Sequence, residues 1–230
     1  MLAWLLKSTI ALFHDWVRRR SDHPVQQVRQ LLEHLTRAGE NRGILVDLGA
    51  GPEVFHLAPF WQGPRVAIDL VVGPGVDVVA DGQALPLRED SVDAVLLMEV
   101  LEHVPDPLGL LQECSRALRP GGHLCLTVPQ YHILHNHPAD YYRFTRHGLE
   151  HLCRGAGFRI QALQARGGPL LVVFHAVELN LPPTLRILFV AATYALFERL
   201  DGWLCGHGNR PGVRDAVGWT LLGVKDGAGA

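Results

Sequence analysis

Two kinds of hydrophobic pattern alternate along this chain. Short, continuously apolar runs occur at residues 43–48, 65–69, 76–81, 92–98, 123–128, 158–165 and 217–224. Runs of this length are typical of strands buried on both faces of a parallel sheet. Between them, apolar residues recur every three or four positions, as they do in helices. These helices are expected at 24–38, 53–59, 106–118 and 146–154. Strands alternating with helices predict an α/β fold with a doubly wound sheet.

Two further segments are unusually apolar. The apolar residues of segment 1–17 share one helical face: Leu2, Leu5, Leu6, Leu12, Phe13 and Trp16. From residue 170 to residue 197 only Glu178 and Arg186 are charged, and Pro182-Pro183 divides the segment. This pattern predicts two helices joined at a proline corner. The chain then divides into N-terminal helices at 1–40, a core at 41–166, a helical insertion at 167–216 and a last strand with a tail at 217–230.

Composition narrows the class of protein. Charged residues are 19% and hydrophobic residues 48% of the chain, which argues against a disordered chain. The net charge of −2 argues against a general nucleic-acid binder, which needs a basic surface. No apolar run reaches the roughly 20 residues that a transmembrane helix requires. None of the four cysteines forms a C-x-x-C pair, so we expect structural thiols in a reducing, cytoplasmic setting.

The first predicted strand leads into a glycine-rich turn, Asp47-Leu48-Gly49-Ala50-Gly51-Pro52. Glycines at such a turn let the backbone approach a ligand closely, and the helix that follows offers free N–H groups. The turn lacks the third glycine of the dinucleotide fingerprint, because that position is Val54. A nicotinamide-dependent oxidoreductase is therefore disfavoured.

Two more acids follow the second and third predicted strands. Asp69 comes about 20 residues after the glycine turn, where an acid can accept hydrogen bonds from ribose hydroxyls. Asp81, followed by Gly82, can contribute to reading an adenine amino edge. The carboxyl ends of parallel strands meet at one edge of a sheet, so these acids and Asp47 predict a nucleoside site there.

The motifs in order resemble the class I S-adenosylmethionine-dependent methyltransferases, most closely their type 11 small-molecule group. The segments that carry the resemblance are 44–52, Asp69, 81–87, 91–95, 101–107 and 118–122, within residues 40–165. The resemblance implies a Rossmann-like, seven-stranded sheet whose last strand is antiparallel, and S-adenosylmethionine as cofactor. One departure is Glu53, where the family often has a third glycine.

The resemblance also implies which residues hold the cofactor. They are Asp47, Gly49, Ala50, Gly51, Asp69, Leu70, Asp81, Gly82, Met98 and Glu99. His103 either orients the loop after the fourth strand or contacts the cofactor. In the family the glycine loop holds the methionine end, the second acid the ribose and the third acid the adenine. The residues that follow the fourth strand line the methionine side.

A second block, residues 132–145, looks like the H-x-P-x-D-Y-Y-R-F-T segment of a bacterial methyltransferase subgroup. His137 is our preferred catalytic base and His135 the second choice, while Asp140, Tyr141 and Arg143 are candidates for positioning the acceptor. In the alternative, Asp140 and Arg143 pair to shape the loop and the tyrosines pack over the cofactor. The spacing H-x-x-H-x-H is not a standard zinc pattern, so no metal is expected.

These observations predict a methyltransferase that acts on a small-molecule or lipid- or glycan-linked acceptor, at oxygen. The alternative is a non-catalytic module that binds the cofactor or a partner. Three roles stay open for segments 1–17 and 170–197: a cap over the substrate mouth, a homodimer interface, or contact with a membrane surface aided by Arg18-Arg19-Arg20. The third role would place the protein at the inner face of the membrane.

Overall fold

The computed structural model describes residues 23–51, 60–135, 139–205 and 215–227. Its centre is one sheet with the strands β1 (Leu45–Leu48), β2 (Arg65–Asp69), β3 (Val78–Val79), β4 (Val92–Met98), β5 (Leu118–Pro129), β6 (Phe158–Arg166) and β7 (Gly218–Lys225). The strand order is β3-β2-β1-β4-β5-β7-β6. Strands β1 to β5 run parallel, whereas β7 lies antiparallel between β5 and β6. The predicted α/β fold with an antiparallel last strand is confirmed.

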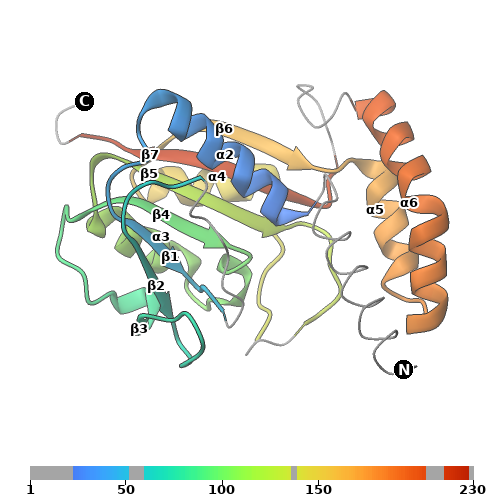
Figure 1. Ribbon diagram of the computed structural model, residues 1–230, viewed down its shortest axis with the longest axis horizontal. Helices are drawn as coiled ribbons and strands as arrows, with labels where there is room; N and C mark the ends of the chain where they lie inside the picture. Colours follow the sequence, from blue (N-terminus) through green and yellow to red (C-terminus); the bar gives the residue numbers. More distant parts are fainter. Residues whose placement is uncertain (1–22, 52–59, 136–138, 206–214, 228–230) are drawn as a thin grey trace.

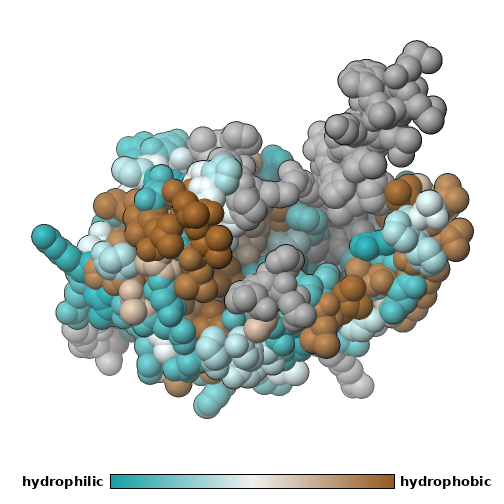
Figure 2. Space-filling model, turned by 90° about the horizontal axis from the view of Figure 1, so that it is seen from below, coloured by the Kyte–Doolittle hydropathy of each residue, from teal (hydrophilic) through white to brown (hydrophobic). Residues whose placement is uncertain are grey.

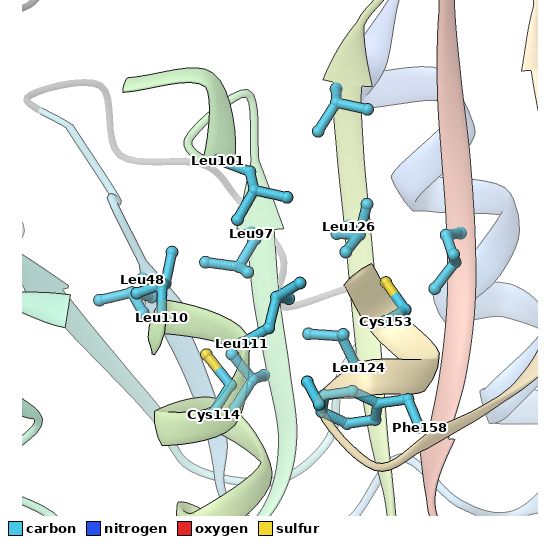
Figure 3. Packing of buried hydrophobic residues seen from close by; sticks show 14 of the residues in the cluster. Leu48, Leu97, Leu101, Leu110, Leu111, Cys114, Leu124, Leu126, Cys153 and Phe158 are labelled. Carbon is cyan, nitrogen blue, oxygen red and sulfur yellow. The ribbon is translucent and has the colours of Figure 1, made fainter. Parts of the chain in front are cut away.

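Helices cover both faces of the sheet (Figure 1). The described helices are α2 (Pro24–Ala38), α3 (Pro107–Ala117), α4 (Arg146–Gly155), α5 (Pro169–Glu178) and α6 (Pro183–Cys205), with short 3-10 helices η1 (Gly82–Ala84) and η2 (Leu101–His103). Helix α2 packs on one face against β1, β4 and β5, and α3 and α4 pack on the other. Figure 3 shows the second interface, where leucines of α3 interlock with those of β1, β4 and β5.

Local sequence explains the ends of α2. Pro24 occupies the first turn, where its missing N–H leaves no hydrogen bond unmade. The backbone N–H of Val25 donates to Nδ1 of His23, which caps the helix. Gly39 ends it with φ of 76°, a left-handed conformation that glycine adopts without strain. The helix predicted at 24–38 is confirmed.

Two predicted strands differ from the structure. The third is only Val78–Val79, and just before it the Asp77 carboxylate accepts from Ala67 N at 2.8 Å. Strand β5 begins at Leu118 rather than at residue 123, with an irregular register between Val92 and Ala94 of its neighbour. The predicted helices at 1–17 and 53–59 lie outside the described residues.

Helices α5 and α6 form the predicted apolar pair and meet near the proline corner, although α6 continues to Cys205. Their shared core is a cluster of aromatic and aliphatic side chains around Phe174, whose ring stacks on Phe189 with centroids 5.2 Å apart. The pair lies beyond the carboxyl end of β6 (Figure 1). No helix among the described residues is both long and apolar enough to cross a membrane.

The outer surface of this helix pair keeps apolar side chains exposed, as the brown areas on the right of Figure 2 show. They include Val173, Leu185, Leu188, Leu196 and Trp203.

The cysteines Cys114, Cys125 and Cys153 are buried in the core. Burial raises the pKa of each of these thiols to about 12, so none is a thiolate at neutral pH. These three have the structural role that the sequence predicts.

Candidate functional site

The chain leaves β1 in one direction towards β2 and β3, and later returns on the other side to form β4. This reversal makes a switch point at the carboxyl ends of β1 and β4, where open α/β sheets bind their ligands. Residues from the ends of β1, β2, β4, β5 and β6 contribute side chains here.

The turn after β1 requires glycine at two positions. Gly49 has φ of 74°, and a Cβ there would lie 2.4 Å from Cγ2 of Val100. Gly51 has φ of 64°, but its Cβ would meet nothing within 4 Å among the described residues. Backbone N–H groups of Gly49 and Ala50 both donate to the Ile68 carbonyl, which ties the turn to β2. The turn is therefore tied to β2, and no described atom lies within 4 Å of a Cβ built at Gly51.

Asp69 joins the end of β2 to this turn. Its Oδ2 accepts from Gly51 N and its Oδ1 from Val71 N, each at 2.9 Å. Beyond it, Leu70 and Val71 are exposed. An acid at this position can accept hydrogen bonds from ribose hydroxyls.

Asp47 and Asp81 lie differently. The Asp47 carboxylate is buried, and its Oδ2 accepts from Nε and Nη2 of Arg65 at 3.0 and 2.7 Å. Burial raises the pKa of Asp47, and the hydrogen bond from Arg65 opposes that rise. Asp81 is exposed, and its Oδ1 accepts from Gln83 N at 2.9 Å, capping η1. The cofactor roles of both acids stay predictions.

Gly82 follows Asp81 in a crowded place. A Cβ there would lie 2.6 Å from Cδ1 of Leu110 on α3. Close packing against α3 therefore explains a glycine at this position.

The end of β4 carries a strained acid. Glu99 directly follows Met98 and has φ of 56°, in a left-handed region that non-glycine residues seldom occupy. Strain of this kind concentrates at functional sites. Its carboxylate pairs with Nη2 of Arg166 at 2.9 Å, and that nitrogen also donates to the Val128 carbonyl at 3.1 Å. Arg166 ends β6 and is buried, and the sequence analysis missed it. The one available signal was a charged residue at the end of a largely apolar strand.

Glu102 is the second residue that the sequence analysis missed. It lies in η2 and is fully buried, and neither carboxylate oxygen has a hydrogen-bond partner among the described residues. Burial, together with the negative charge of Glu99, raises the pKa of Glu102 to about 9. The sequence signal that could have pointed to Glu102 is an acid between the apolar residues Val100, Leu101 and Val104.

The loop after β5 is organised by Arg143. Its guanidinium donates to both carboxylate oxygens of Asp140, from Nη2 to Oδ2 at 2.6 Å. It also donates to the carbonyls of His132, Ile133 and Tyr142. The hydrogen bond from Arg143 holds the pKa of Asp140 well below its usual range. This geometry corresponds to the loop-shaping alternative, and contact of Arg143 with an acceptor stays a prediction.

The loop packs onto η2 and brings three imidazoles together. Backbone N–H groups of Tyr141 and Tyr142 donate to the Glu102 carbonyl at 2.8 and 3.3 Å. The ring of His135 lies 4.8 Å from that of His103 and 4.7 Å from that of His132, centroid to centroid. Both tyrosine side chains are exposed. His137, the preferred base, lies outside the described residues.

Replacing Arg143 by methionine is expected to release this loop. Five of its hydrogen bonds go to Asp140 and to carbonyls of the loop residues His132 and Ile133, so we expect a loss of about 1–3 kcal/mol of stability. Hydrogen exchange at the amides of His135 and Tyr141 should become faster. The control is Arg146→Met, which removes only a surface pair with Glu150 and should cost under about 0.5 kcal/mol. Unchanged exchange in Arg143→Met would contradict the anchoring role.

Comparisons with known proteins agree with this geometry. Residues 62–126 match the family model described as Methyltransferase domain, a segment that begins after the glycine turn. A Mycobacterium bovis protein named as an uncharacterized methyltransferase is 36% identical over 132 residues, or 54% of this chain and 48% of that protein. The ubiquinone biosynthesis O-methyltransferase of Stutzerimonas stutzeri is 28% identical over 134 residues, or 49% of this chain and 56% of that protein. The chain thus spans about half the length of the curated relatives it matches.

Among solved structures, the 1,6-didemethyltoxoflavin-N1-methyltransferase of Burkholderia thailandensis was determined with 1,6-didemethyltoxoflavin and S-adenosylhomocysteine bound. It aligns with a TM-score of 0.56 over 98% of this chain and 89% of that one, at 20% sequence identity. At this identity the likeness shows the fold alone.

Proposed function

We propose that the protein is an S-adenosylmethionine-dependent methyltransferase, because its fold is that of class I methyltransferases and part of its sequence matches the methyltransferase family model. Its acceptor would be a small molecule or a lipid- or glycan-linked molecule, methylated at oxygen. The observation that carries the proposal is the contact between Asp69 and the open turn at Gly51. This contact brings a ribose acceptor group next to backbone that a ligand can approach.

The site fits an adenosine carrying a charged amino-acid arm. The described residues leave the space above Gly51 unoccupied, and a side chain at this position would fill it. Asp69 would hold the ribose, and the exposed side chains Leu70 and Val71 would lie under the base. Met98 and Glu99, at the end of β4, would face the methionine arm, and the carboxylate of Glu99 suits its ammonium group.

S-adenosylmethionine supplies a methyl carbon bound to a positively charged sulfur. The protein has to hold the acceptor oxygen in line with that carbon and receive its proton. His135 is the candidate base within the described residues, and 30% of its side chain is exposed. Asp140 lies 3.3 Å from Nδ1 of His135 and would orient the ring and stabilise its protonated form. His137 stays our first choice from the sequence.

The acceptor is expected to enter beside α5 and α6. Strand β6 ends at Arg166, which contacts Glu99, and α5 begins only three residues later. The apolar helix pair therefore borders the site, which favours an acceptor with an apolar part (Figures 1 and 2). Attachment to a membrane, pairing of two copies and a cap over the site all stay predictions for segment 170–197.

Binding of S-adenosylhomocysteine tests the proposal. We expect calorimetry to show micromolar binding of this product and none of NADH. Asp69→Ala should weaken the binding by about 1–3 kcal/mol, or roughly 5- to 150-fold, because hydrogen bonds to a charged group are lost. The matched control is Asp226→Ala, an exposed acid after β7 whose pair with Arg159 is at the surface. Micromolar binding of NADH without binding of S-adenosylhomocysteine would overturn the proposal.

The non-catalytic alternative predicts the same binding but no turnover. Incubating the protein with S-adenosylmethionine and a panel of hydroxylated small molecules and lipid-linked glycans separates the two. Formation of S-adenosylhomocysteine that depends on one acceptor supports the enzyme. Binding without acceptor-dependent product across the panel supports the module.

A further inference from the structure

Three potential metal ligands converge beside the end of β4. They are a carboxylate oxygen of Glu102 and ring nitrogens of His103 and His135, and these atoms lie within 4.8 Å of one another. Two of the residues come from η2 and the third from the loop after β5. This is not the H-x-x-H-x-H set that the sequence analysis considered, because only His135 belongs to both. The fold assembles the group from positions more than 30 residues apart in the sequence.

Within the part of the chain that the structure describes, the Glu102 carboxylate lacks the hydrogen-bond partners that a buried acid normally has. It is fully buried, and neither oxygen makes a hydrogen bond among the described residues. Nε2 of His103 lies 3.8 Å from its Oε1. A buried polar group without a partner is costly, and native proteins seldom leave one so. A cation between this carboxylate and the imidazoles would supply the missing contact.

Hydrogen bonds orient both imidazoles as they do in metal sites. Nδ1 of His103 lies 2.6 Å from the Ala139 carbonyl, which only accepts, so Nδ1 carries the hydrogen and Nε2 offers its lone pair. Nε2 is the atom that faces Glu102. Metal-binding histidines almost always donate their other N–H to a carbonyl or a carboxylate in this way.

The ring of His135 is oriented in a similar way, by a carboxylate instead of a carbonyl. Its Nδ1 lies 3.3 Å from Oδ2 of Asp140, and Arg143 holds that carboxylate from both of its terminal nitrogens. The pairing leaves Nε2 of His135 as the ligand atom. A chain of carboxylate, imidazole and metal is a common second layer of zinc sites.

We propose that Glu102, His103 and His135 bind a divalent transition-metal ion of the zinc class. Two imidazoles with one carboxylate select such ions over Mg²⁺ and Ca²⁺, which prefer oxygen ligands. Three protein ligands with an open fourth position are the pattern of catalytic zinc sites. Ligand atoms around a tetrahedral zinc lie roughly 3.3 Å apart, from bonds of about 2.0–2.1 Å. The three side chains therefore move together by about 1.5 Å at most when the ion binds.

The open position would face the acceptor, an extension that rests on the proposed function. A hydroxyl oxygen bound there becomes more acidic, so it loses its proton near neutral pH and attacks the methyl carbon as an alkoxide. In this arrangement the metal takes over the role of base from His135, whose Nε2 is then a ligand. The proton leaves to solvent, and the electrons of the broken carbon–sulfur bond remain on sulfur as S-adenosylhomocysteine forms. The metal would thus both position the acceptor hydroxyl and make it more acidic.

Cobalt binding to the full-length protein tests the site. After treatment with a chelator and removal of the chelator, titration with Co²⁺ is expected to give visible absorption bands that saturate at about one equivalent and disappear on addition of Zn²⁺. Glu102→Gln keeps the size of the side chain but removes its charge, and His135→Gln removes an imidazole from the loop. Each is expected to lower the affinity for Co²⁺ by at least about 10- to 100-fold. The matched control is His151→Gln, an exposed histidine on α4, which should leave it unchanged.

The outcomes separate this proposal from the proposed function. Failure of the wild-type protein to bind Co²⁺, or equal binding by His135→Gln, overturns the metal site and leaves a hydrogen-bonded cluster. Because 30% of the His135 side chain is exposed, that variant remains informative even where Glu102→Gln does not fold. Calorimetry with S-adenosylhomocysteine on the same samples reports the cofactor site independently. If the protein binds S-adenosylhomocysteine but not Co²⁺, only the metal site is rejected. If it binds Co²⁺ but not S-adenosylhomocysteine, only the proposed methyltransferase function is rejected.

Discussion

Gly51→Val is expected to lower the affinity for S-adenosylhomocysteine by more than about 100-fold, which corresponds to at least about 2.7 kcal/mol. Gly51 has φ of 64°, so any side chain there is strained, and a β-branched one most of all. The added atoms would also fill the space above the turn, where the described residues leave a Cβ free of contacts. Backbone strain in the turn and the loss of space above it would both lower the affinity for the ligand.

A second glycine separates these two effects. Gly121, near the start of β5, has φ of 77°, and a Cβ there also meets nothing within 4 Å among the described residues. It lies at the other end of the parallel strands, away from the site. Gly121→Val should therefore show a similar fall in melting temperature, of a few degrees for a left-handed cost of about 1–2 kcal/mol, and bind S-adenosylhomocysteine normally. Equal affinities in the two variants would contradict a ligand above Gly51.

The second large effect concerns stability. Asp201→Ala is expected to lower the free energy of unfolding by about 3 kcal/mol, because backbone N–H groups would lose a charged acceptor inside the protein. Asp201 lies in α6 and is buried. Its Oδ2 accepts from Gly168 N at 2.6 Å, and its Oδ1 accepts from Leu170 N and Leu171 N at 2.9 and 3.4 Å. One carboxylate therefore caps α5 and holds it against α6.

Thermal and urea unfolding measure this effect. A loss of 3 kcal/mol should lower the melting temperature by about 6–12 °C in a chain of this size. Asp201→Asn, which keeps one acceptor oxygen, should fall between the wild type and the alanine variant. Glu150→Ala removes a surface pair on α4 and should cost under about 0.5 kcal/mol. A melting temperature of Asp201→Ala equal to that of Glu150→Ala would show that α5 does not depend on this cap.

Much of the arrangement of helices and strands could be predicted from the sequence alone. The bounds of α2, β2 and β4 follow from residues close together in the chain, such as Pro24 and Gly39 around the apolar stripe of α2. The glycine turn could be found for the same reason, since its conformation depends on Gly49 and Gly51 themselves. The aligned strand ends then predict where a ligand binds, because parallel strands deliver their carboxyl ends to one edge.

The partners of the polar side chains could not be found in this way. Asp47 was expected to face the cofactor, yet its described partner is Arg65 at the start of β2. The sequence left open whether Arg143 contacts an acceptor or pairs with Asp140, and the structure shows its guanidinium donating to Asp140 and to carbonyls of its own loop. In each case the pairing depends on how a loop or a neighbouring strand returns, and local periodicity carries no information about that.

The same distinction applies to the group at the end of β4. The sequence by itself determined that strands and helices alternate, that a glycine turn follows the first strand and that apolar helices lie beyond the sixth. Only the tertiary structure decided that Arg166 meets Glu99, and that Glu102 is buried beside His103 and His135 with no hydrogen-bond partner among the described residues. Local elements arise from neighbouring residues, whereas the burial and pairing of charges depend on which distant segments the sheet order brings together. The chemistry of this site therefore depends on the tertiary structure, because it rests on the burial and pairing of charges.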